Sequence, residues 1–270
     1  MDISDLSARG LVLLGCGKMG GAMLQGWLSG GLAAEAVHVL EPYPSDWLKG
    51  TGVALNGDLP ANPAVVLVAV KPQMMASALP VLTPLGNGTT LFLSIAAGTL
   101  ISHYESVLGD KTPVVRAMPN TPAAIGKGIS AIVGNAHASE AQMQLAETLL
   151  RAIGQVVRLP GEHLMDAVTA VSGSGPAYVF HLIETMAAAG VAEGLRPDLA
   201  LHLARATVAG AGALAEASDD DPAQLRVNVT SPGGTTAAAL QVLMDADTGF
   251  PALLKRAVHA AAERGKELGK

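Results

Sequence analysis

The sequence predicts an α/β domain with parallel strands, followed by an all-helical domain. Up to about residue 160, short apolar runs alternate with helical stretches, which is the order that builds parallel sheets. After Pro160-Gly161 we find no strand pattern, and long runs rich in Ala and Leu take over. Hydrophobic residues make up 50% of the chain and aromatic residues only 3%, so closely packed helix must form much of the core.

The first β-α-β unit is expected at the start of the chain. Residues 11–14 form an apolar run that predicts a strand, residues 19–28 read as a helix, and residues 36–40 are rich in β-formers. Residues 64–70 form a second apolar run without polar alternation. A strand of this kind is typical of a parallel sheet that is covered on both faces.

The remaining elements follow from the same patterns. Further strands are expected at residues 90–95, 113–117, 130–133 and 155–158, with a helix over 139–153 whose N-cap is Ser139. In the second part, the helical patterns are broken at residues 172–176, 194–197, 218–222 and 231–234. We place the boundary near residue 162, so the two domains are expected to span residues 1–162 and 163–270.

Composition excludes several classes of function. The net charge is −6 and the Lys and Arg residues are scattered, so we expect no nucleic-acid partner. The amino terminus is acidic, and no apolar run reaches the ~20 residues that a membrane span needs, so we expect neither a signal peptide nor a membrane helix. The single cysteine, Cys16, is interpreted as a small space-filling residue. We therefore expect a cytoplasmic protein that needs no disulfide or metal.

A glycine-rich motif, Gly15-Cys16-Gly17-Lys18-Met19-Gly20, follows the first predicted strand and opens the first helix. Glycines in this pattern make a tight turn, admit a pyrophosphate and let helix pack on strand. Glu41 ends the second strand about 20 residues later, where an acid binds the ribose 2′-hydroxyl. An exposed Glu beside a plain turn is the alternative. We expect a Rossmann-type dinucleotide site that includes Gly15, Gly17, Lys18, Met19, Gly20 and Glu41.

Three more segments end at the predicted carboxyl edge of the sheet, where ligands bind in such folds. Residues 69–72 end a buried strand, although Lys71 alone would suggest a capping or surface residue. Residues 94–98 are small and allow close backbone approach to a cofactor. Asn120 lies in a rigid turn, where it either bonds a carboxamide or satisfies its own backbone. The candidate cofactor residues therefore also include Ala69, Val70, Lys71, Pro72, Ala96 and Asn120.

A second anion site is predicted at residues 229–236, which precede an apolar helical run over residues 237–244. Proline and two glycines set a tight turn there. The unpaired N–H groups and the positive dipole end of the helix that follows can hold a carboxylate. In the alternative, Ser231 and Thr235 simply cap that helix. One glycine turn for a dinucleotide and another for a small acid favour a reductase.

With these segments in order, and with Ala170-Val171-Ser172-Gly173-Ser174-Gly175-Pro176-Ala177-Tyr178 between them, the chain closely resembles the pyrroline-5-carboxylate reductases over nearly its whole length. The SPGGxT turn that follows an SGSGPAY segment carries the resemblance. It implies the last step of proline biosynthesis, in which 1-pyrroline-5-carboxylate is reduced to L-proline with NADPH or NADH. It also implies an all-α dimerisation domain that forms homodimers, often assembled further into decamers.

The resemblance assigns the substrate residues. It implies that Ser231, Gly233, Gly234 and Thr235 hold the substrate carboxylate, and that the Thr236 hydroxyl, as the catalytic group, meets the ring nitrogen. The segment that contains Ser174 would line the floor beneath the nicotinamide, with a structural kink as the alternative. Neither motif of the helical part contains a histidine or a carboxylate. A partly protonated cyclic imine accepts hydride without a strong enzymic acid, so catalysis would consist mostly of proximity and orientation.

Two rival functions remain open on the sequence alone. A β-hydroxyacid dehydrogenase would share the layout, but it places a catalytic lysine on the helix after the nucleotide domain, and residues 161–192 contain no lysine. A non-catalytic NAD(P)-binding sensor is the other rival. On the cofactor itself, Glu41 favours NADH because it would repel the 2′-phosphate of NADPH. Its side chain could also turn away, and Lys49 or Ser45 could then reach that phosphate.

Overall fold

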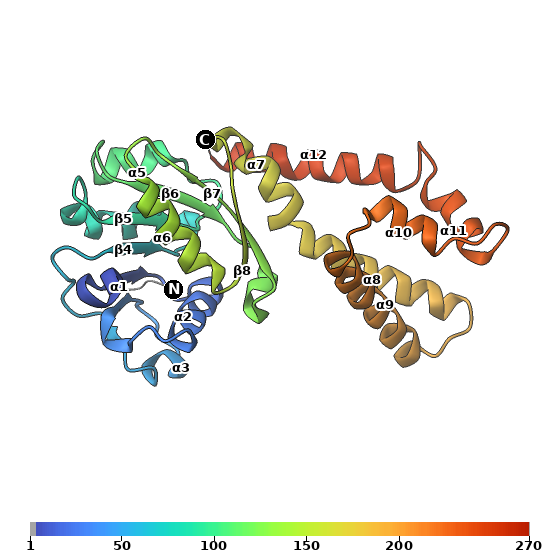
Figure 1. Cartoon of the computed structure of the whole chain (residues 1–270), viewed down its shortest axis with the longest axis horizontal. Coiled ribbons are helices and arrows are strands. Elements are labelled where there is room, and N and C mark those ends of the chain that lie inside the picture. Colours follow the sequence, from blue (N-terminus) through green and yellow to red (C-terminus); the bar gives the residue numbers. More distant parts are fainter. Residues whose placement is uncertain (1–3, 270) are drawn as a thin grey trace. The chain divides into compact units, whose positions relative to one another are not determined.

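Two compact units make up the computed structural model, which describes residues 4–269 (Figure 1). One unit contains the chain up to Gly173 together with the end of the chain from Ala262, and the other contains residues 174–261. The strand patterns of the sequence stop earlier, near residue 162. The division by packing lies later because residues 162–173 pack on the first unit, where Met165 joins a core cluster and the Ser172 carbonyl accepts from Asn120. The end of the chain joins the same unit, with Leu268 against Gly98.

An eight-stranded sheet forms the centre of the first unit, in the order β3-β2-β1-β4-β5-β6-β7-β8. Every neighbouring pair is parallel except the antiparallel pair of β6 and β7. The strands are β1 (Leu11–Leu14), β2 (Val37–Leu40), β3 (Ala54–Leu55), β4 (Val65–Val68), β5 (Leu91–Ser94), β6 (Val114–Met118), β7 (Gly128–Gly134) and β8 (Gly154–Arg158). Each strand expected from the sequence is confirmed, whereas β3 was not expected.

The register of the sheet aligns the carboxyl ends of its central strands. Leu14 of β1 pairs with Leu40 of β2 and with Val68 of β4, and Val68 pairs in turn with Ser94 of β5. Residues that directly follow these strands therefore share one edge. The glycine motif, Glu41 and residues 69–72 all lie at this edge, as ligand-binding segments do in doubly wound folds.

Helices cover both faces of this sheet. The α-helices of the first unit are α1 (Ser4–Arg9), α2 (Lys18–Ser29), α3 (Asp46–Lys49), α4 (Met75–Ala78), α5 (Ile101–Leu108), α6 (Glu140–Arg151) and α7 (Met165–Val168). Trp27 of α2 packs in one core cluster and donates its indole N–H to the Leu149 carbonyl of α6 at 2.9 Å. Tyr104 of α5 packs in the other cluster with Phe92 of β5. Burial on both faces explains why β1 and β4 are apolar throughout.

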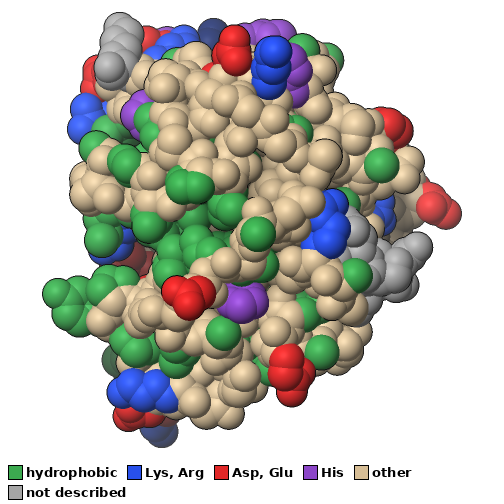
Figure 2. Space-filling view, turned by 90° about the vertical axis from the view of Figure 1, so that its left-hand side faces the viewer, with side chains coloured by type: hydrophobic (Ala, Val, Ile, Leu, Met, Phe, Trp, Pro, Cys, Tyr) green, Lys and Arg blue, Asp and Glu red, His purple; other side chains and the backbone are tan. Residues whose placement is uncertain are grey.

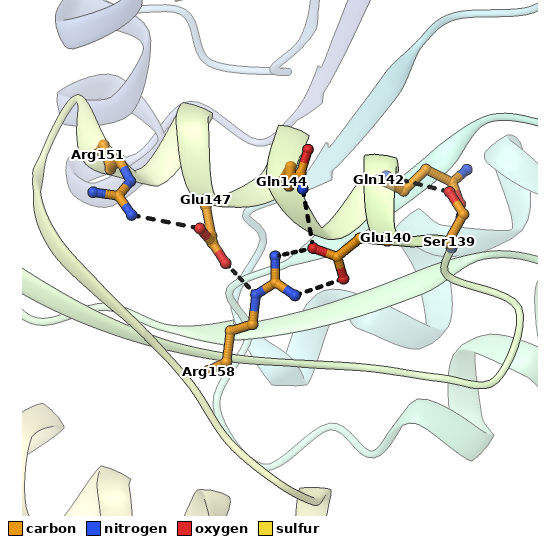
Figure 3. A network of polar contacts seen from close by, with 7 residues as sticks. All are labelled: Ser139, Glu140, Gln142, Gln144, Glu147, Arg151 and Arg158. Atoms are coloured by element: carbon orange, nitrogen blue, oxygen red, sulfur yellow. Dashed lines mark hydrogen bonds and ion pairs between the residues drawn. The ribbon is translucent and has the colours of Figure 1, made fainter.

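The start of α6 confirms the N-cap expected from the sequence. The Ser139 hydroxyl accepts a hydrogen bond from the Gln142 N–H at 3.3 Å, and the Gln142 side chain accepts one from the Ser139 N–H at 2.9 Å. This reciprocal arrangement satisfies two backbone donors at once. An exposed ion network then joins α6 to β8 (Figure 3). Arg158 of β8 forms a bidentate pair with Glu140, at 2.7 and 2.8 Å, and a further bond to Glu147.

The second unit is all helical, as expected. Its helices are α8 (Gly175–Ala192), α9 (Pro197–Ala217), α10 (Pro222–Asn228), α11 (Thr235–Leu243) and most of α12 (Phe250–Leu268). The helices α8 and α9 pack side by side (Figure 1). Within residues 174–261, all of which the structure describes, no large hydrophobic side chain is fully buried. This unit therefore leaves an unusual amount of apolar surface uncovered.

The break expected at residues 172–176 is present, but it takes the form of a widened turn. The α-helix α7 ends at Val168, residues 169–173 form a π-helical segment, Ser174 is a bend, and α8 begins at Gly175. The hydroxyls of Thr169 and Ser172 donate to the carbonyls of Met165 and Val168, four residues back, at 2.9 and 3.1 Å. Pro176 does not end the helix because it lies in the first turn of α8, where no intrahelical N–H bond is lost.

The surface agrees with the charge pattern of the sequence. On the face that Figure 2 shows, the Lys and Arg side chains stand apart from one another and form no basic patch. Among the described residues, no helix is both long enough and apolar enough to cross a membrane.

Candidate cofactor and substrate sites

The glycine turn after β1 is packed tightly against the end of β4. Gly15 has a φ of +87°, and a Cβ there would lie 2.9 Å from Val70 Cγ1 and 3.1 Å from the Ala69 carbonyl carbon. A Cβ at Gly20 would lie 2.6 Å from the Gly15 oxygen and 3.2 Å from Ala69 Cβ. These two positions therefore require glycine for the turn and for the packing of α2 on the sheet.

Gly17 has the opposite surroundings. It is exposed, and a Cβ built on it meets no atom within 4 Å. Gly17 is also the N-cap of α2 and provides no side-chain cap, so the N–H groups of Lys18 and Met19 in the first turn lack an acceptor within the helix. An open glycine beside unpaired N–H groups and a positive helix end suits a pyrophosphate. The residues present therefore fit a dinucleotide.

Glu41 is bound to the glycine turn rather than simply exposed. Its Oε2 accepts a hydrogen bond from the Cys16 N–H at 2.8 Å, and its Oε1 accepts one from the Tyr43 N–H at 3.1 Å. Asn56 bonds both backbone groups of Glu41, since Oδ1 accepts from the Glu41 N–H and Nδ2 donates to the Glu41 carbonyl, each at 2.9 Å. The alternative of an exposed Glu beside a plain turn is therefore wrong.

Cys16 lies half-buried in this turn. Burial, reinforced by the negative charge of Glu41, raises the pKa of the Cys16 thiol to about 11. Because only the thiolate is an effective nucleophile, this thiol is unreactive near neutral pH. The interpretation as a space-filling residue stands.

Residues 69–72 leave β4 beside the glycine turn. The Ala69 N–H donates to the Leu14 carbonyl at 2.8 Å, which extends the pairing of β4 with β1 by one residue. Lys71 follows with an exposed side chain, and its carbonyl accepts from the Met74 N–H at 2.9 Å at the start of a 3-10 turn (Pro72–Met74). Lys71 thus lies at the carboxyl edge of the sheet, and as the exposed N-cap of this turn it also fits the alternative of a capping or surface residue. Its contact with the cofactor stays a prediction.

A buried polar cluster that the sequence did not predict supports the neighbouring segment. The Ala96 N–H donates to the Ser94 hydroxyl at 3.2 Å, and that hydroxyl is hydrogen-bonded to the Tyr104 hydroxyl. Tyr104 is fully buried, and burial raises the pKa of its phenol. Nearby, the buried Arg116 donates to Glu162 Oε1 at 2.5 Å. Polar residues inside otherwise apolar strands were the available signal, since Ser94 ends β5 and Arg116 lies within β6.

The Asn120 side chain forms hydrogen bonds to two other segments of the chain. Its Oδ1 accepts from the Ile129 N–H of β7 at 3.0 Å, and its Nδ2 donates to the Ser172 carbonyl at 3.1 Å. The suggestion that it merely satisfies its own turn is therefore wrong. A contact with the cofactor stays a prediction.

The second glycine turn leads into α11. Gly233 has a φ of +69°, and the Gly234 N–H donates to the Ser231 carbonyl at 3.0 Å, which closes the turn. Gly234 is the N-cap of α11 and no side chain caps the helix, so the alternative in which Ser231 and Thr235 serve as caps is wrong. The N–H groups of Thr235 and Thr236 have no acceptor within the helix. Backbone donors and exposed hydroxyls therefore lie together, as a carboxylate site requires.

Ser174 is the N-cap of α8, and its carbonyl accepts from the Ala177 N–H at 3.0 Å. Its side chain makes no cap, so the hydroxyl is not committed to the helix. The role of Ser174 at the substrate stays a prediction.

An open groove of about 750 Å³ lies elsewhere on the first unit. It is lined by residues that precede β1, β5 and β6, among them Arg9, Thr89 and Lys111, and by the start of α6. These residues lie at the amino ends of the parallel strands, so the groove is not the candidate cofactor site.

Comparison with known proteins gives a consistent result. Residues 162–268 match the family model described as pyrroline-5-carboxylate reductase dimerisation. The chain is 39% identical to the pyrroline-5-carboxylate reductase of Pseudomonas aeruginosa, over 97% of this chain and 98% of that protein. It is 40% identical to the reductase of Methanosarcina acetivorans, over 95% and 97% of the two chains.

Solved structures agree. A pyrroline-5-carboxylate reductase from Coxiella burnetii superposes with a TM-score of 0.90 at 33% identity and covers 97% of this chain and 99% of its own. A pyrroline carboxylate reductase from Plasmodium falciparum, solved with NADP bound, superposes with a TM-score of 0.84 at 29% identity, over 98% and 99% of the two chains. The predicted order of a Rossmann-type domain and a helical domain is thereby confirmed.

Proposed function

Because the chain belongs to the pyrroline-5-carboxylate reductase family, we propose that it reduces 1-pyrroline-5-carboxylate to L-proline with NAD(P)H. Apart from family membership, one observation carries the proposal. The turn before α11 presents uncapped N–H groups and exposed hydroxyls in a chain that also has a dinucleotide turn. Family membership sets aside the β-hydroxyacid dehydrogenase that the sequence left open.

The cofactor is proposed to bind at the carboxyl edge of the first unit. When bound, NAD(P)H supplies the hydride. Gly17 and the first N–H groups of α2 would hold the pyrophosphate, Glu41 would bind the adenosine ribose, and residues 69–72 with Ala96 would lie along the cofactor. The open space at Gly17 and the orientation of Glu41 toward the turn support this assignment. The reductase from Plasmodium falciparum provides a precedent, since it was solved with NADP bound.

The substrate carboxylate is proposed to bind at the turn before α11. The substrate carboxylate would be bound by the hydroxyls of Ser231 and Thr235 and by the backbone N–H groups of Gly233 and Thr235. Gly234, whose own N–H closes the turn, would hold the site in shape, and Thr236 would contact the ring nitrogen. Charge-assisted hydrogen bonds of this kind are stronger than those between neutral groups. The protonated imine then gains hydride at carbon and becomes the secondary amine of proline. These residues therefore act by orientation, with no strong acid required.

We further propose that the active form is a homodimer built through residues 163–270, which in turn can assemble into decamers. Large apolar side chains of the helical unit are exposed, among them Phe180, Leu214, Val242 and Leu254. A second copy would cover surface of this kind, and the matching family model is described as a dimerisation region. A cytoplasmic location is proposed as well, because the single cysteine is free.

A turnover assay tests the proposed function. Purified protein is mixed with 1-pyrroline-5-carboxylate and either NADH or NADPH, and both loss of absorbance at 340 nm, the standard signal of the reduced nicotinamide, and formation of L-proline are followed over time. We expect proline to form in proportion to the cofactor oxidised. A protein that binds cofactor but forms no proline would instead be the NAD(P)-binding sensor.

A further inference from the structure

We propose that this chain selects NADH over NADPH because Glu41 is locked in place at the position of the adenosine ribose. The inference rests on the proposed function, since it concerns the cofactor of that reaction. The sequence left open whether the Glu41 side chain turns away and lets a cation take the 2′-phosphate. The contacts of this region decide between the two possibilities.

Hydrogen bonds on both sides of the residue fix Glu41. The Cys16 and Tyr43 N–H groups hold the two carboxylate oxygens, at 2.8 and 3.1 Å, while Asn56 holds the backbone N–H and carbonyl. Asn56 directly follows β3 and has a left-handed backbone conformation, with a φ of 51°. Turning the carboxylate away would leave the Cys16 N–H, which is partly buried, without its acceptor.

A carboxylate held in this way still has room for ribose hydroxyls. It offers about four lone-pair sites, and the two N–H donors occupy only two of them. The two adenosine ribose hydroxyls of NADH can therefore donate to the remaining sites. A 2′-phosphate is mostly doubly ionised at neutral pH, so it would bring a negative charge against the fixed carboxylate where NADH brings a hydroxyl donor.

Lys49 and Ser45, which the sequence suggested as partners for the 2′-phosphate, make other contacts. The Lys49 Nζ pairs with Asp46 Oδ1 at 3.1 Å, so its charge is partly balanced. The Ser45 hydroxyl accepts from the Leu48 N–H at 3.2 Å and caps α3. Residues 41–46 contain two acids and no Lys or Arg, so a 2′-phosphate would enter a negative segment.

Binding measured on the protein alone tests the inference. NADH and NADPH are titrated separately by nicotinamide fluorescence against the wild type, Glu41→Gln and a control, Glu35→Gln. The control removes an equal charge before β2, at the opposite end of that strand. Each variant is checked for folding by thermal melting in circular dichroism.

We expect the wild type to bind NADH at least about 10-fold more tightly than NADPH, a difference of about 1.4 kcal/mol. The Glu41→Gln variant should lose most of this ratio, through weaker NADH binding and stronger NADPH binding, while Glu35→Gln keeps it. If the wild type binds NADPH as tightly as NADH, or if Glu41→Gln keeps the wild-type ratio, the inference is wrong. If Lys18→Gln weakens NADPH binding and leaves NADH binding unchanged, the 2′-phosphate belongs to Lys18 and the inference is also wrong.

The outcome is separable from that of the proposed function. Preferential NADH binding without formation of proline would leave the inference standing and refute the reductase. Formation of proline with a preference for NADPH would do the reverse. Failure to bind either cofactor would overturn both.

Discussion

Three glycines of the dinucleotide turn should respond differently to the same added methyl group. In Gly20→Ala, the new Cβ would lie 2.6 Å from the Gly15 oxygen, which is backbone and cannot move aside without shifting the turn. Overpacking of this kind costs about 1 to 3 kcal/mol. At about 2 to 4 °C per kcal/mol for a chain of this size, we expect Tm to fall by roughly 2 to 12 °C.

In Gly17→Ala, the added methyl group meets no atom of the protein within 4 Å, and the φ of Gly17 is −70°, which alanine adopts without strain. We therefore expect the Tm to be unchanged or slightly raised. If the pyrophosphate lies over this glycine, the methyl group occupies its place, and NADH should bind at least about 10-fold more weakly. Gly15→Ala combines a clash with a φ of +87° and should be the least stable of the three.

Two assays separate these effects. Thermal melting by circular dichroism reports folding, and nicotinamide fluorescence titration reports cofactor affinity. A Gly17→Ala variant that binds NADH like the wild type would refute the placement of the pyrophosphate. A Gly20→Ala variant with the wild-type Tm would refute the packing argument.

Three further predictions follow from other parts of the chain. Thr236→Ala should lower kcat/KM about 100-fold and leave cofactor affinity unchanged. Thr235→Ala should lower kcat/KM by a smaller factor because its backbone N–H remains. Turnover at the wild-type rate by Thr236→Ala would exclude the contact of Thr236 with the ring nitrogen. Glu162→Gln leaves the buried Arg116 without its carboxylate, so we expect it to lower the free energy of unfolding, measured by urea denaturation, by about 3 kcal/mol. The matched change at an exposed pair, Glu184→Gln, should leave the free energy of unfolding almost unchanged. Arg158 holds the pKa of Glu140 below its usual 4.5, so this pair stabilises the fold above that pH and its contribution is lost as the pH falls through the lowered pKa. The Tm of the wild type should therefore fall more steeply below pH 4.5 than that of Glu140→Gln, and equal slopes would contradict this.

Local pattern was enough to predict the sheet because its central strands are buried on both faces. Residues 64–70 are apolar throughout for that reason, and the structure places β4 there. The two-residue strand β3 was not predicted because it is defined only by its pairing with β2, and no local pattern encodes that pairing. The antiparallel direction of β7 depends in the same way on the fold of its neighbours. Strand existence was therefore predictable, whereas pairing direction was not.

The candidate sites show a similar division. Glycine spacing and the acid after β2 located the dinucleotide turn, because both are short-range features. Asn56, which fixes Glu41, and Glu162, which pairs with Arg116, act across long stretches of sequence and give no local signal. The capping alternative for the turn before α11 was wrong for another reason. Ser231 and Thr235 have the right chemistry to cap a helix, but the turn places Gly234 at the N-cap.

The reaction itself tests the account most directly. The decisive measurement is the steady-state rate at which the wild-type protein converts 1-pyrroline-5-carboxylate to L-proline, with the amino acid identified by mass spectrometry and NADH as the reductant. We predict stoichiometric formation of proline and oxidation of NADH, together with loss of the rate in Thr236→Ala. Binding of the cofactor by a folded wild-type protein that forms no proline with either NADH or NADPH would contradict the account.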